Sequence, residues 1–179
     1  MSVLVIQMHG EPGSGKSTVA AELAARIGAV VLDKDVIKAA LLRVGIAEKE
    51  AASGAYEVFF AQARALAEAG QSIVLDNPVY WETVESRWLE IADEAGSPRI
   101  LIECVCPDDS ELERRLSTRE ALESQPRVRL NPDRHPGIAE TQFEPRLILD
   151  TTLPLADLVR SAVAYVDARL REARSVAAR

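Results

Sequence analysis

A glycine-rich segment near the N-terminus lies between two segments of different character. It reads Gly10-Glu11-Pro12-Gly13-Ser14-Gly15-Lys16-Ser17, followed by Thr18, and matches the complete phosphate-loop pattern G-x-x-x-x-G-K-[ST]. An apolar run at residues 3–6 comes directly before it, and a helical pattern at residues 19–27 comes directly after it. Strand, loop and helix therefore occur in the order that this motif requires. We predict that the chain binds a nucleoside triphosphate.

Most positions of this loop have a chemical role. Glycines let the backbone curl so that successive N–H groups point at phosphate oxygens, and the following helix adds its positive N-terminal end. Lys16 is expected to bridge the β- and γ-phosphates, and the Ser17 hydroxyl is expected to coordinate Mg²⁺. The residues predicted to contact ATP are Gly10, Gly13, Ser14, Gly15, Lys16, Ser17 and Thr18.

Size and charge exclude several classes of function. The 179 residues suit one domain over positions 1–179, and 21 basic against 28 acidic residues give a net charge of −7. Such acidity disfavours long nucleic acid as a partner, although a local basic site could still bind a short oligonucleotide. No segment approaches the roughly 18 apolar residues of a membrane span. The first predicted strand begins within two residues of Met1, which leaves no room for a signal peptide, so we expect a cytoplasmic protein. The oligomeric state is not indicated.

Short apolar runs alternate with helical patterns along the chain. Strands are expected at residues 3–8, 29–32, 72–75, 99–105 and 146–149, and helices at 16–27, 35–44, 51–69, 81–95, 109–124 and 155–173. This β-α alternation predicts an α/β fold of three layers, with helices on both faces of a parallel sheet. The nucleotide should bind beyond the carboxyl ends of the strands.

One region, residues 114–137, concentrates positive charge and interrupts the alternation. It contains Arg114, Arg115, Arg119, Arg127, Arg129 and Arg134, together with Pro126, Pro132, Pro136 and Gly137. We interpret it as a lid that closes over ATP and stabilises charge on the transferred phosphoryl group. The alternative is a solvated helix face, on which glutamates pair with the arginines.

Other classes of phosphate-loop protein fit less well. A GTPase would carry N-K-x-D, which does not occur in the sequence. Motor and AAA+ ATPases usually carry an apolar strand that ends in Asp-Glu, whereas here Leu75 is followed by the lone acid Asp76 and then by Asn77. A lone carboxylate suits a small kinase, in which it supports Mg²⁺ or holds the acceptor. The alternative for Asp76 is a cap or turn residue.

Four segments together resemble the small P-loop kinases. They are Gly10–Thr18, Asp33–Lys38, Ile73–Asn77 and Arg115–Arg119. These kinases are similar to the kinase half of polynucleotide kinase and, more distantly, to gluconate, shikimate, adenylylsulfate and antibiotic-modifying kinases. The resemblance spans nearly the whole chain; its first motif is specific and the others are short. It implies a P-loop NTPase fold, whose five-stranded parallel sheet has the order 2-3-1-4-5, with an arginine-rich lid.

The resemblance also implies residue roles. Asp35 lies nineteen residues after Lys16 and fits the pattern D-x-x-[RK], which Lys38 completes, so it is the expected acceptor-binding general base. Asp33 is the competing acid at the tip of the second strand. Helix N-capping is the structural alternative for either of them.

Lid and loop residues receive roles from the same resemblance. Arg119 is expected to reach the transferred phosphate and Arg115 to contact ATP; because they are four residues apart on a predicted helix, they should face one cleft. Arg127 is a candidate acceptor or ATP contact. Thr151, in the loop after the fifth strand, is expected near the adenine, and capping of the last helix by Thr152 is the alternative.

The acceptor site is expected between residues 38–60 and 78–81. Five of the chain's eight aromatic residues fall there: Tyr56, Phe59, Phe60, Tyr80 and Trp81. They could wall a ring-containing acceptor, with Tyr80 as a substrate contact, although core packing is the better interpretation for Phe59 and Phe60.

The sequence therefore predicts an ATP- and Mg²⁺-dependent kinase that phosphorylates a hydroxyl of a small molecule. One alternative is a polynucleotide or nucleoside 5′-hydroxyl kinase. Another is a non-catalytic ATP-binding switch module, for which an acceptor carboxylate would not be expected.

Overall fold

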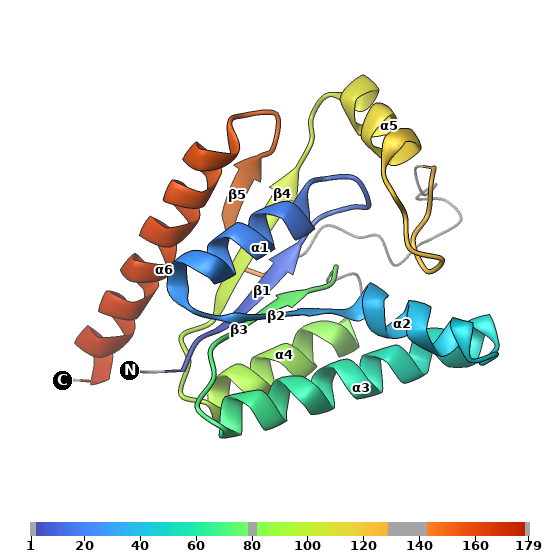
Figure 1. Ribbon diagram of the computed structural model, residues 1–179. Coiled ribbons are helices and arrows are strands. Elements are labelled where there is room, and N and C mark those ends of the chain that lie inside the picture. The colour runs from blue at the N-terminus through green and yellow to red at the C-terminus, as the bar shows by residue number, and fades with distance from the viewer. Residues whose placement is uncertain (1–2, 79–81, 129–142, 178–179) are drawn as a thin grey trace.

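The structure is a computed structural model of the 179-residue chain, and it describes residues 3–78, 82–128 and 143–177 (Figure 1). Its elements in chain order are β1 (Val5–His9), α1 (Lys16–Ile27), β2 (Val30–Asp33), α2 (Lys34–Arg43), α3 (Glu48–Glu68), β3 (Ile73–Asp76), α4 (Glu82–Glu94), β4 (Ile100–Val105), α5 (Asp109–Thr118), β5 (Leu147–Asp150) and α6 (Leu155–Ala177). The predicted alternation of strands and helices is confirmed.

The strands form one parallel sheet of order β2-β3-β1-β4-β5, as the resemblance implied. The register places Gln7 of β1 beside Leu75 of β3 and Leu101 of β4, and Asp33 beside Asp76 at the ends of β2 and β3. Because all strands run the same way, the residues that follow them meet at one edge of the sheet. This edge carries the phosphate loop.

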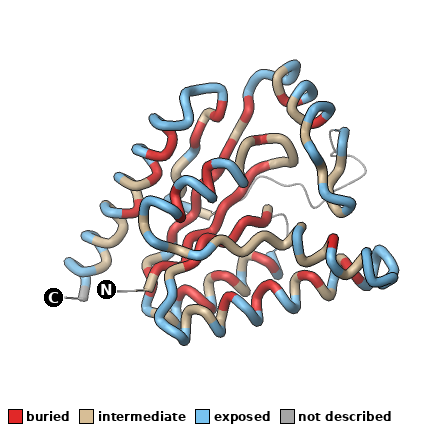
Figure 2. Tube along the Cα trace, in the orientation of Figure 1, coloured by how far each residue is buried: buried red, intermediate tan, exposed pale blue. Residues whose placement is uncertain are grey.

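Helices cover both faces of the sheet, so the central strands β3, β1 and β4 are almost entirely buried, whereas the edge strands β2 and β5 are partly exposed (Figure 2). Alternate strand residues face opposite ways: Ile6 and Met8 belong to a core shared with α1 and α6, whereas Val5 belongs to one shared with α3 and α4. Burial on both faces explains why the strands read as continuous apolar runs rather than as alternating ones. Within the described residues, no helix combines the length and apolar character needed to cross a membrane.

The helix predicted over residues 109–124 is shorter in the structure. α5 ends at Thr118, and Arg119 caps it with an extended backbone (φ −68°, ψ 147°). The buried side of α5 consists of Leu112 and Leu116, and the next positions on that side are Arg119 and Glu120. With no further apolar side chain to bury, continuing the helix would gain little, since packing supplies most helical stability.

The core contribution can be tested with a matched pair of isoleucines. Ile102 of β4 is 0% exposed, whereas Ile148 of the edge strand β5 is 53% exposed. We expect Ile102→Ala to lower the free energy of unfolding by about 2–5 kcal/mol through lost burial and a cavity. Ile148→Ala should cost at most about 1 kcal/mol. Urea denaturation measures both, and equal losses would contradict the described burial.

Candidate nucleotide and acceptor site

The phosphate loop joins β1 to α1 through a backbone that only glycine fits at its first position. Gly10 has φ 141°, and a Cβ atom there would lie 2.4 Å from the carbonyl oxygen of Cys104 and 2.6 Å from the Ser14 hydroxyl oxygen. The turn is closed by a hydrogen bond that the Ser14 N–H donates to the Glu11 carbonyl (3.1 Å). Any side chain at position 10 would therefore push the loop away from β4.

The start of α1 fits an anion. Gly15 is its N-cap in the left-handed conformation (φ 84°), and no side chain caps the first turn. The Ser14 hydroxyl is buried and has no hydrogen-bond partner among the described residues. Uncapped helix N–H groups beside a buried, unsatisfied hydroxyl are the donors that phosphate oxygens require. Ser17 and Thr18 are exposed at the same helix start.

Lys16 is held at the end of β3 by Asp76. The Lys16 Nζ atom lies 2.6 Å from Asp76 Oδ1, and the two side chains are 13% and 2% exposed. Burial alone would lower the pKa of Lys16, but Asp76, with smaller contributions from Asp35 and Asp33, outweighs it and raises this pKa. Lys16 is therefore a stable cation at the phosphate loop. Asp76 forms an ion pair with it, and Asp35 and Asp33 are close enough to raise its pKa.

Asp33 and Asp35 occupy different positions at the start of α2. Asp33 is the N-cap, and its Oδ1 accepts a hydrogen bond from the Asp35 N–H at 2.7 Å. Burial, and then the negative charge of Asp76, raise the pKa of Asp33. The Asp35 carboxylate instead lies 2.6 Å from Lys34 Nζ. The capping alternative is thus realised by Asp33, while the catalytic role of Asp35 stays a prediction.

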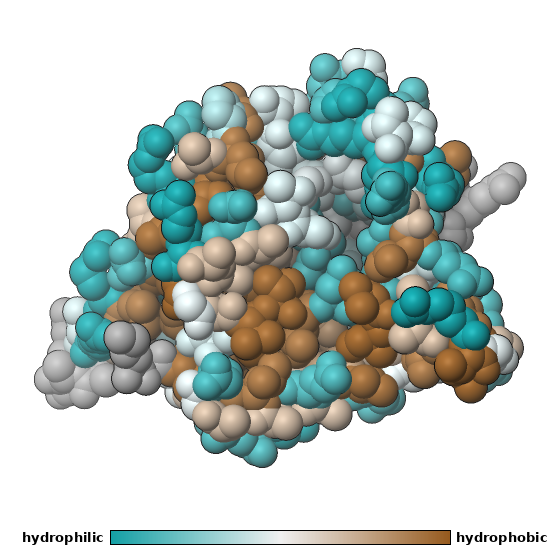
Figure 3. Space-filling view, viewed as in Figure 1, coloured by the Kyte–Doolittle hydropathy of each residue, from teal (hydrophilic) through white to brown (hydrophobic). Residues whose placement is uncertain are grey.

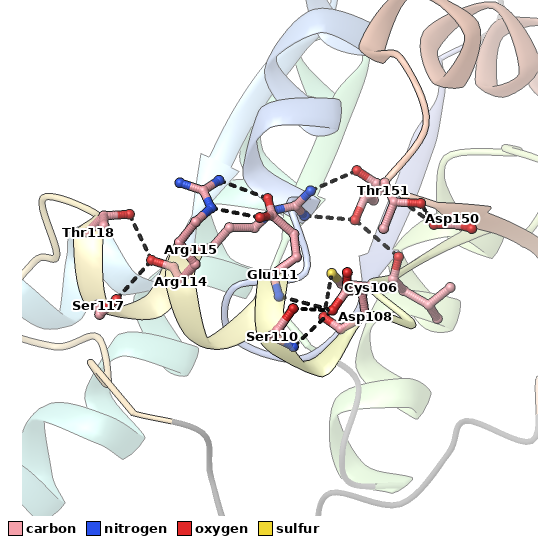
Figure 4. A network of polar contacts seen from close by, with 12 residues as sticks. Cys106, Asp108, Ser110, Glu111, Arg114, Arg115, Ser117, Thr118, Asp150 and Thr151 are labelled. Atoms are coloured by element: carbon pink, nitrogen blue, oxygen red, sulfur yellow. Dashed lines mark hydrogen bonds and ion pairs between the residues drawn. The ribbon is translucent and has the colours of Figure 1, made fainter.

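Arg115 joins α5 to the loop after β5 (Figure 4). Its Nη1 and Nη2 atoms donate to the hydroxyl and carbonyl oxygens of Thr151 at 3.0 and 2.9 Å, and its Nε donates to Glu111 at 2.7 Å. Both Arg115 and Thr151 approach Gly15, where a Cβ atom would lie 3.5 and 3.4 Å from them. Two predicted nucleotide contacts, from distant parts of the chain, therefore meet at the phosphate loop. The Thr152 hydroxyl donates a hydrogen bond to the Asp150 carboxylate at 2.7 Å.

The expectation that Arg115 and Arg119 share one helix face is wrong, because α5 ends before Arg119. The Arg119 guanidinium donates through Nη2 to the Pro126 carbonyl, and its buried Nε has no partner among the described residues. Burial lowers the pKa of Arg119, and the charge of Asp35 opposes this shift. Ser124 then donates to the Asp35 carbonyl at 2.7 Å. The segment after α5 thus reaches the start of α2 at the Asp35 backbone, instead of continuing along the helix from Arg115.

Part of the arginine-rich region is a solvated helix face. Arg114 is exposed and pairs with Glu111 at 2.7 Å along α5, and Figure 3 shows α5 covered mainly by hydrophilic side chains. Arg127 is also exposed. The rest of the predicted lid, residues 129–137, lies outside the described residues. The alternative therefore holds for Arg114, whereas Arg115 pairs with the same Glu111 and in addition donates hydrogen bonds to Thr151 outside the helix.

The remaining acceptor candidates have mixed outcomes. Lys38 of α2 forms an ion pair with Glu48 at the start of α3. Phe59 and Phe60 are fully buried in the core shared with α3 and α4, so their core-packing interpretation is confirmed. Tyr80 lies outside the described residues. Within those residues, no group of three or more His, Cys, Asp or Glu side chains is arranged to hold a metal ion.

Sequence reasoning missed a buried polar group on the α3 and α4 side of the sheet. Gln7 is fully buried, and its Nε2 donates to the backbone and side-chain oxygens of Asn77 at 2.8 and 3.1 Å. The available signal was Gln7 itself, a polar residue inside an apolar run.

A second missed group lies beside the phosphate loop. The His9 Nε2 atom is 3.9 Å from Glu103, whose other oxygen accepts a 2.6 Å hydrogen bond from Arg146. Burial, followed by the charges of Lys16 and Arg146, lowers the pKa of His9 to about 4. His9 is therefore neutral near pH 7, so the ion pair of Glu103 is with Arg146.

A phosphate loop after β1, a lone acid after β3 and the strand order β2-β3-β1-β4-β5 define a P-loop nucleotide-binding domain with the fold of the small kinases. Residues 5–132 match the family AAA_33, described as an AAA domain, and the chain belongs to this family. None of the curated proteins matches the sequence.

Three solved kinases show the same fold along nearly their whole length. A sugar kinase from Janibacter sp. is 22% identical with a TM-score of 0.68, covering 92% of this chain and 95% of the other. A gluconokinase from Sinorhizobium meliloti is 20% identical with a TM-score of 0.67, covering 99% and 98%. An APS kinase from Mycobacterium tuberculosis, in complex with AMPPNP and APS, is 17% identical with a TM-score of 0.63, covering 93% and 98%.

The lowered pKa of His9 predicts a pH-dependent stability. The unfolded chain takes up this proton below about pH 6.5 and the folded chain only near pH 4, so acid favours unfolding between these values. From pH 7 to 4 the wild-type chain should lose about 2–3 kcal/mol more of its free energy of unfolding than His9→Gln. Urea denaturation at several pH values measures this difference. Between pH 8 and 9 the two proteins should show the same pH dependence, and equal acid losses would contradict a neutral buried His9.

Proposed function

We propose that this protein is an ATP- and Mg²⁺-dependent kinase that transfers the γ-phosphoryl group to a hydroxyl of a small-molecule acceptor. The observation that carries the proposal is that Asp35 acts electrostatically on both Lys16 and Arg119, which come from separate segments. Ser124, in the segment that follows Arg119, donates a hydrogen bond to the Asp35 carbonyl oxygen at 2.7 Å and so joins that segment to the start of α2. A carboxylate that interacts with two cations suits phosphoryl transfer, which depends on positioning and charge stabilisation. The sugar, gluconate and APS kinases with this fold support it.

The phosphate loop would hold the nucleotide. Loop N–H groups and the unsatisfied Ser14 hydroxyl would bind phosphate oxygens, and Lys16 would bind the β- and γ-phosphates. Ser17 and Asp76 would hold Mg²⁺, which supplies neutralisation of phosphate charge when bound. Asp76 would therefore act on the nucleotide in two ways: through Mg²⁺, and through Lys16, which it holds by an ion pair.

Asp35 is the proposed general base. The Asp33 carboxylate caps α2. The Asp35 carboxylate does not cap the helix and instead contacts the Lys34 ammonium group. Asp35 would orient the acceptor hydroxyl and take its proton as the new O–P bond forms. The demand on the base is modest, because the transition state of such reactions is loose.

The arginine-rich region would act as the lid. Arg115, fixed by Thr151, would contact ATP at a constant position, and Arg119 would stabilise charge on the transferred phosphoryl group. Arg127 and Lys38 would contact the acceptor. We further propose that residues 1–179 form a single cytoplasmic domain with residues 114–137 as this lid.

Transfer to a panel of acceptors tests the function. ADP release with Mg²⁺ is measured for sugars, gluconate, nucleosides, short 5′-hydroxyl oligonucleotides, and aminoglycoside- or macrolide-like antibiotics, with phosphorylated products identified by mass spectrometry. We expect one acceptor class to stimulate ADP release, Lys16→Ala to abolish it, and Lys49→Ala, an exposed lysine of α3, to preserve it. Tight ATP binding with no stimulated transfer would contradict the proposal and favour an ATP-binding switch. Phosphorylated oligonucleotide would favour the 5′-hydroxyl kinase.

A second prediction separates the two aspartates. Asp35→Asn should lower kcat by roughly 10²-fold or more, since it removes the base, while ATP affinity is retained. Asp33→Asn is the matched control, because asparagine caps helices as well as aspartate does. It should keep most of the activity. The reverse result would show that Asp33 is the base.

A further inference from the structure

Lys34 occupies a position that helix stability does not explain. It is the first residue of α2, where the positive end of the helix dipole disfavours a cation. Its side chain is nevertheless only 14% exposed, and its Nζ lies 2.6 Å from Asp35 Oδ1. The Asp35 side chain is 24% exposed, so the pair is partly shielded from the solvent that weakens surface ion pairs.

The second contact of Lys34 is aromatic. Its Nζ lies 5.5 Å from the ring centroid of Tyr56, within the range of a cation–π interaction. Tyr56 itself comes from α3, and its ring stacks on that of Phe60 with centroids 6.1 Å apart and an interplanar angle of 19°. The buried Phe60 ring therefore supports the Tyr56 ring, which forms a platform for the Lys34 ammonium group.

Tyr56 also packs against the core of the sheet. It is partly buried against the cluster that contains Leu75 of β3. Leu75 directly precedes Asp76, the partner of Lys16. The Tyr56 platform therefore packs beside the strand whose last residue holds Lys16.

We propose that Lys34 is a positioning residue for Asp35. Held between the Tyr56 ring and the Asp35 carboxylate, it fixes the direction of that carboxylate relative to Lys16. The inference rests on the proposed function, because it gives Asp35 the role of base. Its chemical purpose is orientation: a general base contributes fully only when its oxygen is held close to the productive geometry.

The geometry can be tested without an acceptor. Lysines of the folded protein are labelled with acetic anhydride, and the rate at each lysine is measured by mass spectrometry. Lys34 should react several-fold more slowly than the exposed Lys49. Tyr56→Leu should raise the Lys34 rate toward that of Lys49, while Tyr56→Phe, which keeps the ring, should raise it less. Equal rates at Lys34 and Lys49 in the wild-type protein would overturn the inference.

Kinetics test the consequence for catalysis, with the acceptor that the panel identifies. Lys34→Gln should lower kcat by roughly tenfold to a hundredfold, the scale of a slightly misplaced reacting group, with little change in the KM for ATP. Lys34→Arg keeps the charge and should recover much of the loss. Lys49→Gln is the matched control and should behave as wild type, and thermal melting checks that all variants fold.

The outcomes separate this inference from the proposed function. Normal turnover by Lys34→Gln, or equal losses in Lys34→Gln and Lys34→Arg with slow wild-type labelling, would overturn the positioning role alone. Absence of transfer by the wild-type protein to every acceptor would overturn the kinase and, with it, this inference. Slow labelling together with a kcat loss that arginine rescues would establish it.

Discussion

The ion pair between Lys16 and Asp76 is the contact on which the rest of the site depends. Both side chains are largely buried, and a buried charge that loses its partner costs several kcal/mol, on the order of 3–5. The pair can form only because β3 lies directly beside β1 in the sheet. This neighbourhood brings Asp76, the last residue of β3, close to Lys16, which follows the phosphate loop after β1. Strand order thus fixes the charge at the phosphate loop, and Asp35 and Asp33 add smaller contributions that also raise the pKa of Lys16.

Much of the fold was predictable from local patterns. Apolar runs, the phosphate-loop motif and helical periodicity report on contacts within a few residues, and all five predicted strands occur in the structure. The order of the strands came from the resemblance, because no local pattern says which strands pair. The end of α5 was missed for a related reason. Residues 119–124 can form a helix, but the positions that would continue the side of Leu112 and Leu116 are Arg119, Glu120 and Glu123, which are not apolar.

The site was predictable where one motif contains the interaction, and less so where distant segments meet. The phosphate loop and Asp76 could be identified from short motifs, and Arg115 and Thr151 from a resemblance. The Gln7–Asn77 hydrogen bonds and the His9–Glu103–Arg146 contacts join different strands and the segments that flank them. Their partners are tens of residues apart in sequence, so only the sheet register brings them together. The roles assigned to the site residues stay predictions.

The two faces of the sheet differ in polarity at its carboxyl edge, and this difference matters for the proposed chemistry. On the α1 and α6 side, β1 and β4 stay apolar to their ends with Met8 and Cys104. On the α3 and α4 side, the apolar Val5 gives way to Gln7 and His9, with Glu103 beside His9. Buried polar groups are costly unless they are hydrogen-bonded, and the buried Gln7 Oε1 atom has no hydrogen-bond partner among the described residues, so an apolar side chain at position 7 would favour stability. The sheet therefore carries its costly polar groups on the side where the proposed acceptor would bind, and keeps its apolar packing under the helix that would bind ATP.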